Sequence, residues 1–262
     1  MHLNPTQSLT DTIYSEIISR IQEDDNSVPV RRSPYLYYNR TVKDAQYPIY
    51  ARKSGSLEAE EEILLNQNEM EYEYMDLGKF AVSPNHKILA YALDTDGSEN
   101  YTISFKNLET GTLLSSDTIP KAAESIVWAN DSNSIYYTTL DAIHRSDKVY
   151  RHVLGTDPAS DRLLFHETDE KFSVGIYKSM SEKYIFITSS SSLTEETRFL
   201  DAKDASAEPV VFQPREFNHR YSVEHHESQF IILTNGGGQY LNYQLCACPL
   251  VRVDHIKLIL AG

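Results

Sequence analysis

The sequence is poor in basic side chains relative to acidic ones. Its 262 residues contain 24 lysines and arginines against 38 aspartates and glutamates, which gives a net charge of −14. A nucleic-acid-binding surface must be basic because it replaces the counterions of the phosphates, so nucleic acid is not an expected partner. Acidic surfaces attract basic peptides in solution, although the same charge also serves solubility alone.

Cysteine is scarce too, with Cys246 and Cys248 as the only two. On a strand, residues two apart point away from the same face in parallel, which is a poor geometry for a disulfide. No C-x-x-C pair and no histidine at zinc-finger spacing accompanies them, so a zinc site is not expected. We therefore predict a reducing, cytoplasmic location.

Long apolar runs are absent. No stretch approaches the about 20 residues that a membrane-spanning helix needs, and residues 1–10 are too polar for the centre of a signal peptide. We therefore expect neither a membrane partner nor a secretory route. The N-x-S/T triplets at Asn39, Asn100 and Asn130 are then not expected to carry glycans.

The motifs of common catalytic and cofactor sites are missing as well. The sequence has no G-x-S-x-G nucleophile elbow, no P-loop and no G-x-G-x-x-G. Residues Asn235–Gly238 contain the glycines of an oxyanion-hole run, but a hairpin turn that needs positive φ explains them. Residues Ser189–Ser192 are expected to form a polar turn between two strands.

The remaining candidates are histidines. Glu224–Glu227, with the sequence EHHE, is the best metal-like cluster, but neighbours on a strand point to opposite faces, so at most two of the four could share an ion. His152 and His219 have no carboxylate or cysteine at a spacing that suggests a triad. We expect no catalytic residue, no metal and no cofactor in this chain, and the sequence assigns no substrate-binding residue.

What the sequence does contain is a repeated β pattern. Residues 80–82, 88–93 and 101–105 alternate apolar with small or polar residues between turn clusters, which predicts three antiparallel strands. Counterparts of the middle strand start at Ile135, Tyr184 and Phe230, so the copies start 47, 49 and 46 residues apart. Such spacing is typical of four-stranded propeller blades.

The other strands follow from the same pattern. The third strands of the copies are expected at residues 101–105, 148–153, 196–200 and 241–245. Further strands are expected at residues 35–39, 47–52, 62–66, 125–128, 163–166, 174–178, 210–212 and 221–225. The predicted fold class is therefore all-β, a partial propeller of about four to five blades.

Residues 1–26 are predicted to contain a short amphipathic helix. Apolar residues recur every four positions, at Leu9, Ile13, Ile17 and Ile21. We expect Thr10 or Asp11 to cap the start of the helix and residues 24–26 to end it. A helix of this length needs an apolar surface to lie on, which indicates a partner domain or chain.

Two polar segments complete the predicted organisation. Residues 27–34 contain two prolines and are predicted to form a stiff, extended linker. The acidic run Glu58–Glu62 is predicted to be a solvated loop, with a docking site for basic peptide as the alternative.

Four pairs of segments are informative beyond the repeat. These are SVPVRRSPYLYYNRT with YPIYARK, FAVSPNHKILAYALDTDGSENY with TISFKNLETG, VYRHVLGT with DRLLFHE, and PREFNHRYSVEHH with FIILTN. In these segments the chain resembles oligopeptidase B, in the prolyl oligopeptidase family of serine peptidases. The resemblance runs from about Leu9 to Leu250, in order and at the right spacing.

The resemblance implies part of a cytosolic two-domain enzyme. In this family a seven-bladed propeller limits access of peptides to an α/β-hydrolase domain with a Ser-Asp-His triad, and oligopeptidase B cleaves short peptides after Arg or Lys. The resemblance also implies that the helix of residues 1–26 lies on the catalytic domain and that residues 27–34 form the hinge.

We therefore expect residues 35–250 to form an incomplete propeller and residues 251–262 to be an off-pattern tail. The catalytic domain follows the propeller in the family, so we expect this chain to lack it and to be inactive alone. Two alternatives remain at this point, a propeller-type binding module without catalysis and an unrelated propeller scaffold for protein interactions.

Overall fold

The computed structural model describes residues 6–250, so the predicted tail at residues 251–262 lies outside the described part. The described residues divide into two compact units, with the boundary between Tyr72 and Glu73. Within the first unit, helix α1 spans Gln7–Ile18 and is preceded by Thr6, which makes no side-chain capping bond. The expected caps, Thr10 and Asp11, instead lie inside the helix, because the helix begins before its first apolar residue.

The apolar stripe of α1 is uncovered. No residue of the helix is buried. The exposed fractions of Leu9, Ile13 and Ile17 are 60%, 47% and 54%. The predicted stripe is therefore present, and none of the described residues covers it.

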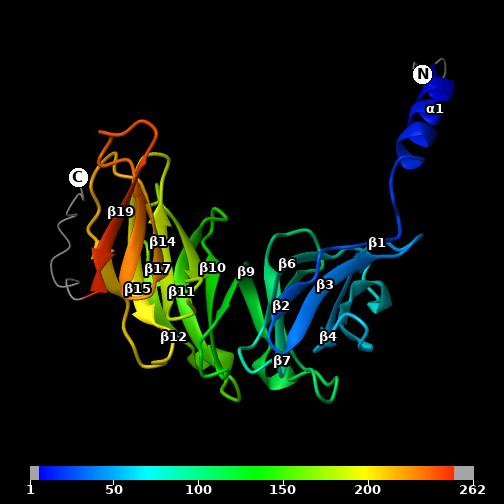
Figure 1. Ribbon diagram of the computed structural model, residues 1–262, viewed down its shortest axis with the longest axis horizontal. Coiled ribbons are helices and arrows are strands. Elements are labelled where there is room, and N and C mark those ends of the chain that lie inside the picture. The colour runs from blue at the N-terminus through cyan, green and yellow to red at the C-terminus, as the bar shows by residue number, and fades with distance from the viewer. Residues whose placement is uncertain (1–5, 251–262) are drawn as a thin grey trace. The chain divides into compact units, whose positions relative to one another are not determined.

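A five-stranded sheet forms the rest of the first unit, with β1 and β2 both paired to β3. Its elements are β1 (Asp25–Asn26), β2 (Val30–Arg32), β3 (Tyr35–Thr41), β4 (Ile49–Ser54) and β5 (Glu61–Asn66), followed by the 3₁₀ turn η2 (Gln67–Glu69) (Figure 1). Residues 27–34 are thus partly a strand, because β2 lies within them and pairs with β3.

The acidic run is divided between a loop and β5. Glu61 is held by two nitrogens of Arg40, with Nη2 2.8 Å from Oε1. Glu62 is held in the same way by Arg52, whose Nη2 lies 2.7 Å from Oε1. The prediction of a solvated loop is therefore wrong for Glu61 and Glu62, because both lie in β5 and pair with arginines of the same sheet, Arg40 on β3 and Arg52 on the adjacent β4.

The second unit contains three antiparallel sheets of seven, four and three strands. The seven-stranded sheet comprises β6 (Asp76–Val82), β7 (Ile88–Asp94), β8 (Tyr101–Asn107), β9 (Ile119–Trp128), β10 (Ser134–Leu140), β11 (Ser146–Val153) and β12 (Arg162–His166). Two 3₁₀ turns connect strands of this sheet, η3 (Ser115–Asp117) before β9 and η4 (Pro158–Ser160) before β12. The others comprise β13 (Ser173–Lys178), β14 (Tyr184–Ser190), β15 (Glu195–Asp201) and β16 (Val210–Gln213), and then β17 (Tyr221–His226), β18 (Gln229–Thr234) and β19 (Gln244–Pro249) (Figure 1).

The predicted repeat is confirmed, with its recurring middle strand at β7, β10, β14 and β18. The seven-stranded sheet contains two copies joined through β9. The start of β9 pairs with β8, where Ala122 lies opposite Tyr101. Its end pairs with β10, where Trp128 lies opposite Ile135. One long strand therefore closes one four-strand repeat and opens the next.

The last repeat departs from the expectation. Its third strand was expected at residues 241–245, but β19 begins at Gln244 and ends at Pro249. The connection before it is longer because the carbonyl of Asn235 accepts hydrogen bonds from the amides of Gly238 and Tyr240. These bonds fold residues 235–240 back on themselves before the strand can start.

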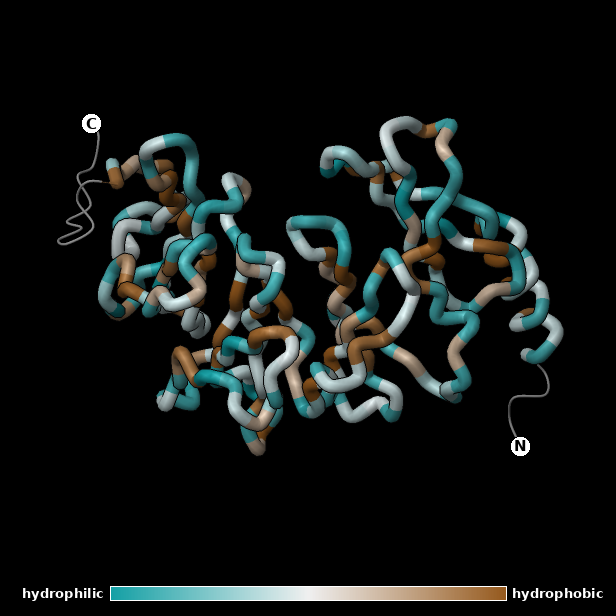
Figure 2. The backbone as a smooth tube through the Cα atoms, turned by 90° about the horizontal axis from the view of Figure 1, so that it is seen from below, coloured by the Kyte–Doolittle hydropathy of each residue, from teal (hydrophilic) through white to brown (hydrophobic). Residues whose placement is uncertain are grey.

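Three apolar clusters form the core of the second unit. The outlying turns of the backbone tube are mostly hydrophilic or neutral in colour, and many of the hydrophobic stretches lie inside them (Figure 2). One cluster is rich in aromatic rings, and its largest fully buried side chains are Phe186 and Phe230. The rings of Phe199 and Phe212 pack against Phe230 at centroid distances of 5.4 and 5.1 Å. Edge-to-face packing of this kind fixes the β13–β16 sheet against the β17–β19 sheet.

Candidate functional site

Three connections meet at one end of the β13–β16 sheet. Because its strands are antiparallel, the start of β13, the turn from β14 to β15 and the end of β16 lie at the same end. A cavity of about 550 Å³ opens there. Its lining residues are Asp169, Lys171, Phe172, Ser191, Ser192, Leu193, Thr194, Arg215 and Phe217.

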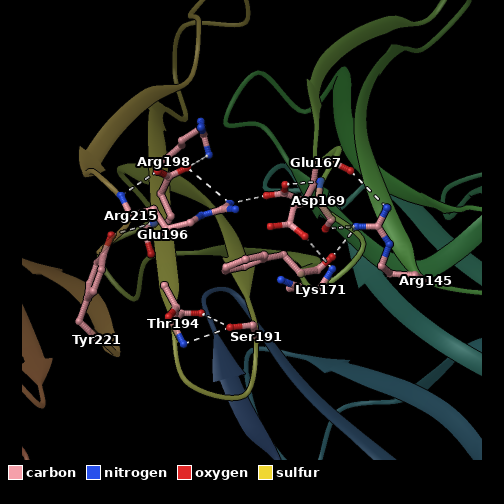
Figure 3. Close-up of polar contacts among 12 residues, drawn as sticks. Arg145, Glu167, Asp169, Lys171, Ser191, Thr194, Glu196, Arg198, Arg215 and Tyr221 are labelled. Carbon is pink, nitrogen blue, oxygen red and sulfur yellow. Dashed lines mark hydrogen bonds and ion pairs between the residues drawn. The ribbon is translucent and has the colours of Figure 1, made fainter. Parts of the chain in front are cut away.

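Arg215 holds two of these connections together. Its guanidinium carbon lies 3.6 Å from the centre of the Phe172 ring, and its Nη2 forms an ion pair with Glu167 (Figure 3). The backbone amide of Arg215 donates to Oε2 of Glu196 at 3.0 Å. Burial alone would raise the pKa of Glu167, but the hydrogen bonds from Arg215 and from the amide of Asp169 outweigh it and lower that pKa.

Arg145 fixes the connection between β12 and β13 from the other side. Its Nη1 donates to the carbonyl oxygens of Asp169 at 2.8 Å and Phe172 at 2.6 Å. Its Nη2 donates to the carbonyl of Glu167 at 3.3 Å, and its Nε donates to Asp141 (Figure 3). The backbone on both sides of Lys171 is therefore held by one side chain.

The turn between β14 and β15 completes the cavity wall. The amide of Thr194 donates to Oγ of Ser191 at 3.1 Å, which closes the turn. Oγ1 of Thr194 accepts from the amide of Asn218 at 3.1 Å and so ties the turn to the β16–β17 connection. Two apolar side chains of the wall face water, since Leu193 is 50% exposed and Phe217 is 84% exposed.

The sequence did not identify this site. The predicted polar turn at residues 189–192 is shifted, because Ser189 and Ser190 belong to β14 and the turn begins at Ser191. Arg215 and Glu167 are 48 residues apart, on connections without a local motif. The only signal was the serine run itself, which marks a turn without indicating what meets it.

His152 has two carboxylate partners that the sequence did not reveal. Its Nδ1 lies 2.8 Å from Oδ1 of Asp161, and its Nε2 lies 3.2 Å from Oδ1 of Asp117. The ring is fully buried. Both ring nitrogens face carboxylates, so neither can take a proton from a serine or cysteine, and the arrangement differs from a triad. The sequence did not reveal Asp117 as a partner because η3, which carries it, lies 35 residues before His152.

His219 also has a carboxylate nearby. Its Nε2 lies 2.9 Å from Oγ1 of Thr234, and its Nδ1 lies 3.8 Å from Glu216. Both His219 and Thr234 are buried. Burial lowers the pKa of His219. A substrate cannot reach a hydroxyl that has no solvent-accessible surface, so this contact is structural.

The EHHE cluster is divided between two sides of β17. Nδ1 of His225 lies 2.8 Å from Oγ of Ser181, whereas His226 lies near Glu227 in solvent. Glu224 accepts hydrogen bonds from the amides of Met180 and His225. Among residues 6–250, no three histidine, cysteine or acidic side chains gather in a way that could hold a metal ion.

The glycine run and the cysteines match their expected geometry. Gly236, Gly237 and Gly238 have φ values of 57°, 70° and 88° and lie between β18 and β19, as a turn requires. Cys246 and Cys248 both pack on the aromatic core cluster, so they share a face of β19. Within the described residues, no helix is long and apolar enough to cross a membrane.

Comparison with known proteins decides the family. The sequence model of the family described as "Prolyl oligopeptidase, N-terminal beta-propeller domain" matches residues 2–257 of this chain. The chain belongs to this family. The predicted fold class and the resemblance to oligopeptidase B are thereby confirmed, and the sheets are those of part of a propeller.

Curated relatives of this chain support the same family assignment. The chain is 38% identical to "Protease 2" of Moraxella lacunata, over 95% of this chain and 37% of that protein. It is 35% identical to "Dipeptidyl aminopeptidase BI" of Pseudoxanthomonas mexicana, over 94% of this chain and 36% of that protein. The chain thus spans little more than a third of the curated relatives that it matches.

Two solved structures match nearly the whole of this chain. Oligopeptidase B from Leishmania major is 34% identical, with a TM-score of 0.87, and the match covers 94% of this chain and 36% of that one. Oligopeptidase B from Trypanosoma brucei with covalently bound antipain, in a closed form, is 31% identical with a TM-score of 0.85.

Proposed function

We propose that this chain is the N-terminal propeller part of an oligopeptidase B-like serine peptidase. In this proposal the propeller admits short peptides to a catalytic α/β-hydrolase part carried by the rest of a longer protein. The observation that supports it best is the match to the Leishmania major enzyme, which covers 94% of this chain but only 36% of that chain.

Cleavage after basic residues is part of the same proposal. The net charge of −14 supports it, because an acidic surface increases the encounter rate of cationic peptides. A cytoplasmic location is also proposed, since a sequence with only two cysteines fits a reducing compartment.

We further propose that residues 1–26 dock on the catalytic part and that residues 27–34 form the hinge to the propeller at residues 35–250. The uncovered stripe of Leu9, Ile13 and Ile17 supports this docking. An amphipathic helix of 12 residues is marginal in water unless its apolar face packs on another surface.

A chimera tests the gating role. Residues 35–250 of this chain replace the corresponding segment of Leishmania major oligopeptidase B, and hydrolysis of a short arginine peptide is compared with that of a long unfolded protein. We expect the chimera to cleave the short peptide and leave the long chain intact. The catalytic part without any propeller is the control, and cleavage of the long chain by a folded chimera would refute gating.

The alternative is a propeller that binds a partner without catalysis. The cavity at the end of the β13–β16 sheet favours it, because a cavity of about 550 Å³ is large enough for a small ligand. This chain alone would then form a stable complex, whereas the peptidase proposal predicts no hydrolysis of arginine or lysine peptides by this chain alone.

A further inference from the structure

We propose that the cavity at the end of the β13–β16 sheet binds the free C-terminus of a short peptide whose last residue is apolar. The carboxylate would lie at Lys171, and the apolar side chain would lie against Leu193 and Phe217. This inference concerns a binding site within the described residues and does not depend on the gating role.

Lys171 is suited to a carboxylate because its ammonium group is not engaged in an ion pair with any described residue, whereas the neighbouring guanidinium of Arg215 is already paired with Glu167. The backbone of Lys171 is held in place, since its amide donates to Oδ1 of Asp169 at 3.0 Å and Arg145 binds the carbonyls on either side. A fixed backbone reduces the entropy lost when the side chain binds a ligand.

Arg215 adds a second donor to the same wall. Its Nη2 is occupied by Glu167, but its Nη1 hydrogen-bonds to no residue that the structure describes. The stack of its guanidinium on Phe172 holds the fork in one orientation. A planar guanidinium in a fixed orientation recognises a carboxylate better than a mobile one does.

The apolar part of the cavity supplies the second half of the recognition. Leu193 and Phe217 line the cavity and face water, and the buried side chain of Phe172 lines the same cavity. Covering such side chains with an apolar ligand group removes their surface from water. A free carboxylate next to an apolar side chain is the chemistry of a peptide C-terminus.

Asp169 limits which peptides fit. Its carboxylate lines the cavity and is exposed, so a second negative charge on the ligand would be repelled. We therefore expect peptides that end in an acidic residue to bind more weakly than peptides that end in phenylalanine. The net charge of −14 does not attract an anionic ligand from a distance, so binding depends on these local contacts.

Direct binding tests the proposal. N-acetyl-Gly-Gly-Phe with a free carboxylate is titrated into the chain and followed by saturation-transfer NMR and calorimetry, which both tolerate self-association. The C-terminal amide and N-acetyl-Gly-Gly-Asp serve as comparisons. We expect saturable binding of the free acid, and binding of both comparison peptides weaker by about tenfold or more.

Two variants locate the ligand. Lys171→Met is expected to weaken binding of the free acid to the level of the amide, and Phe217→Ser is expected to weaken free acid and amide alike. Their controls are Lys203→Met and Leu241→Ser, which change an exposed lysine and an exposed leucine outside the lining. Circular dichroism checks that each variant is folded.

Three results would overturn the proposal. These are no saturation by the free acid, equal binding of acid and amide, and unchanged binding by Lys171→Met. Each of these results can occur while the chimera still excludes long protein chains. Conversely, saturable binding of the free acid can occur when the chimera cleaves long chains. The binding proposal and the gating proposal therefore fail separately.

Discussion

Nδ1 of His152 lies 2.8 Å from Oδ1 of Asp161, and both side chains are buried. Asp117 faces the other ring nitrogen at 3.2 Å, and the hydroxyl of Tyr137 donates to Asp161 at 2.9 Å. Burial, the largest influence, lowers the pKa of His152, but hydrogen bonds and charges from Asp161 and Asp117 together raise it above its usual value. When the ring is protonated it donates to both carboxylates and so joins η3 to the β11–β12 connection.

The first prediction concerns pH. Because the folded pKa of His152 is raised, its contribution to stability is fully present below the unfolded value of about 6.5 and is lost as pH rises through the folded pKa. We expect the difference in free energy of unfolding between the wild type and His152→Gln to shrink as pH rises above neutrality. Urea denaturation at a series of pH values measures this difference.

The control for this experiment is His226→Gln, which changes an exposed histidine. The comparison must be a difference between variants because His219 and His225 have lowered pKa values and act in the opposite direction. A difference that grows with pH above neutrality would show that His152 is neutral in the folded chain.

The second prediction concerns Arg215. Arg215→Ala leaves Glu167 nearly buried without its cation, so we expect a loss of about 3 kcal/mol in the free energy of unfolding. Arg162→Ala is the matched control, because Arg162 pairs with Glu208 in solvent and should change stability by less than about 1 kcal/mol. Urea denaturation measures both, and equal losses would contradict a structural role for the Arg215 contact.

The third prediction uses two glycines on strands. A Cβ atom on Gly78 would lie 2.6 Å from Cε1 of Tyr101 and 2.7 Å from Cβ of Glu124, so Gly78→Ala should destabilise the chain by about 1–3 kcal/mol. A Cβ atom on Gly175 meets open space, so Gly175→Ala should be neutral or stabilise slightly. Thermal unfolding that shows similar effects for both would contradict the packing of β6 against β8 and β9.

The fourth prediction concerns the outer face of the β17–β19 sheet. Leu233 and Leu245 lie opposite each other across β18 and β19 and are 45% and 69% exposed. Neighbouring apolar residues on an open sheet face favour association. We expect the chain by itself to be marginally stable and to self-associate, and the double variant Leu233→Ser, Leu245→Ser to reduce association in sedimentation velocity.

The matched control changes Leu57→Ser and Ile143→Ser, two exposed apolar residues in loops. A chain that stays monomeric and unfolds cooperatively without any substitution would contradict this prediction, as would an equal reduction by the control pair.

The strands were predictable because the alternation of period two lies within the sequence of each strand, as in Ile88–Asp94 and its three counterparts. The site was not, because its contacts join connections whose sequences carry no shared motif. Glu167 meets Arg215 only once β13–β16 have folded between them. The same limit explains Asp117 and His152. The start of β19 was misplaced because the carbonyl of Asn235 folds back the residues before it.

Sequencing the transcript across the codon for Leu250 tests the proposal that this chain is the propeller part of an oligopeptidase B-like peptidase. We expect the reading frame to continue through further blades into a G-x-S-x-G nucleophile elbow. Transcripts that all end after the codon for Gly262 would contradict it, because a chain without the catalytic part cannot hydrolyse peptides by the mechanism of this family.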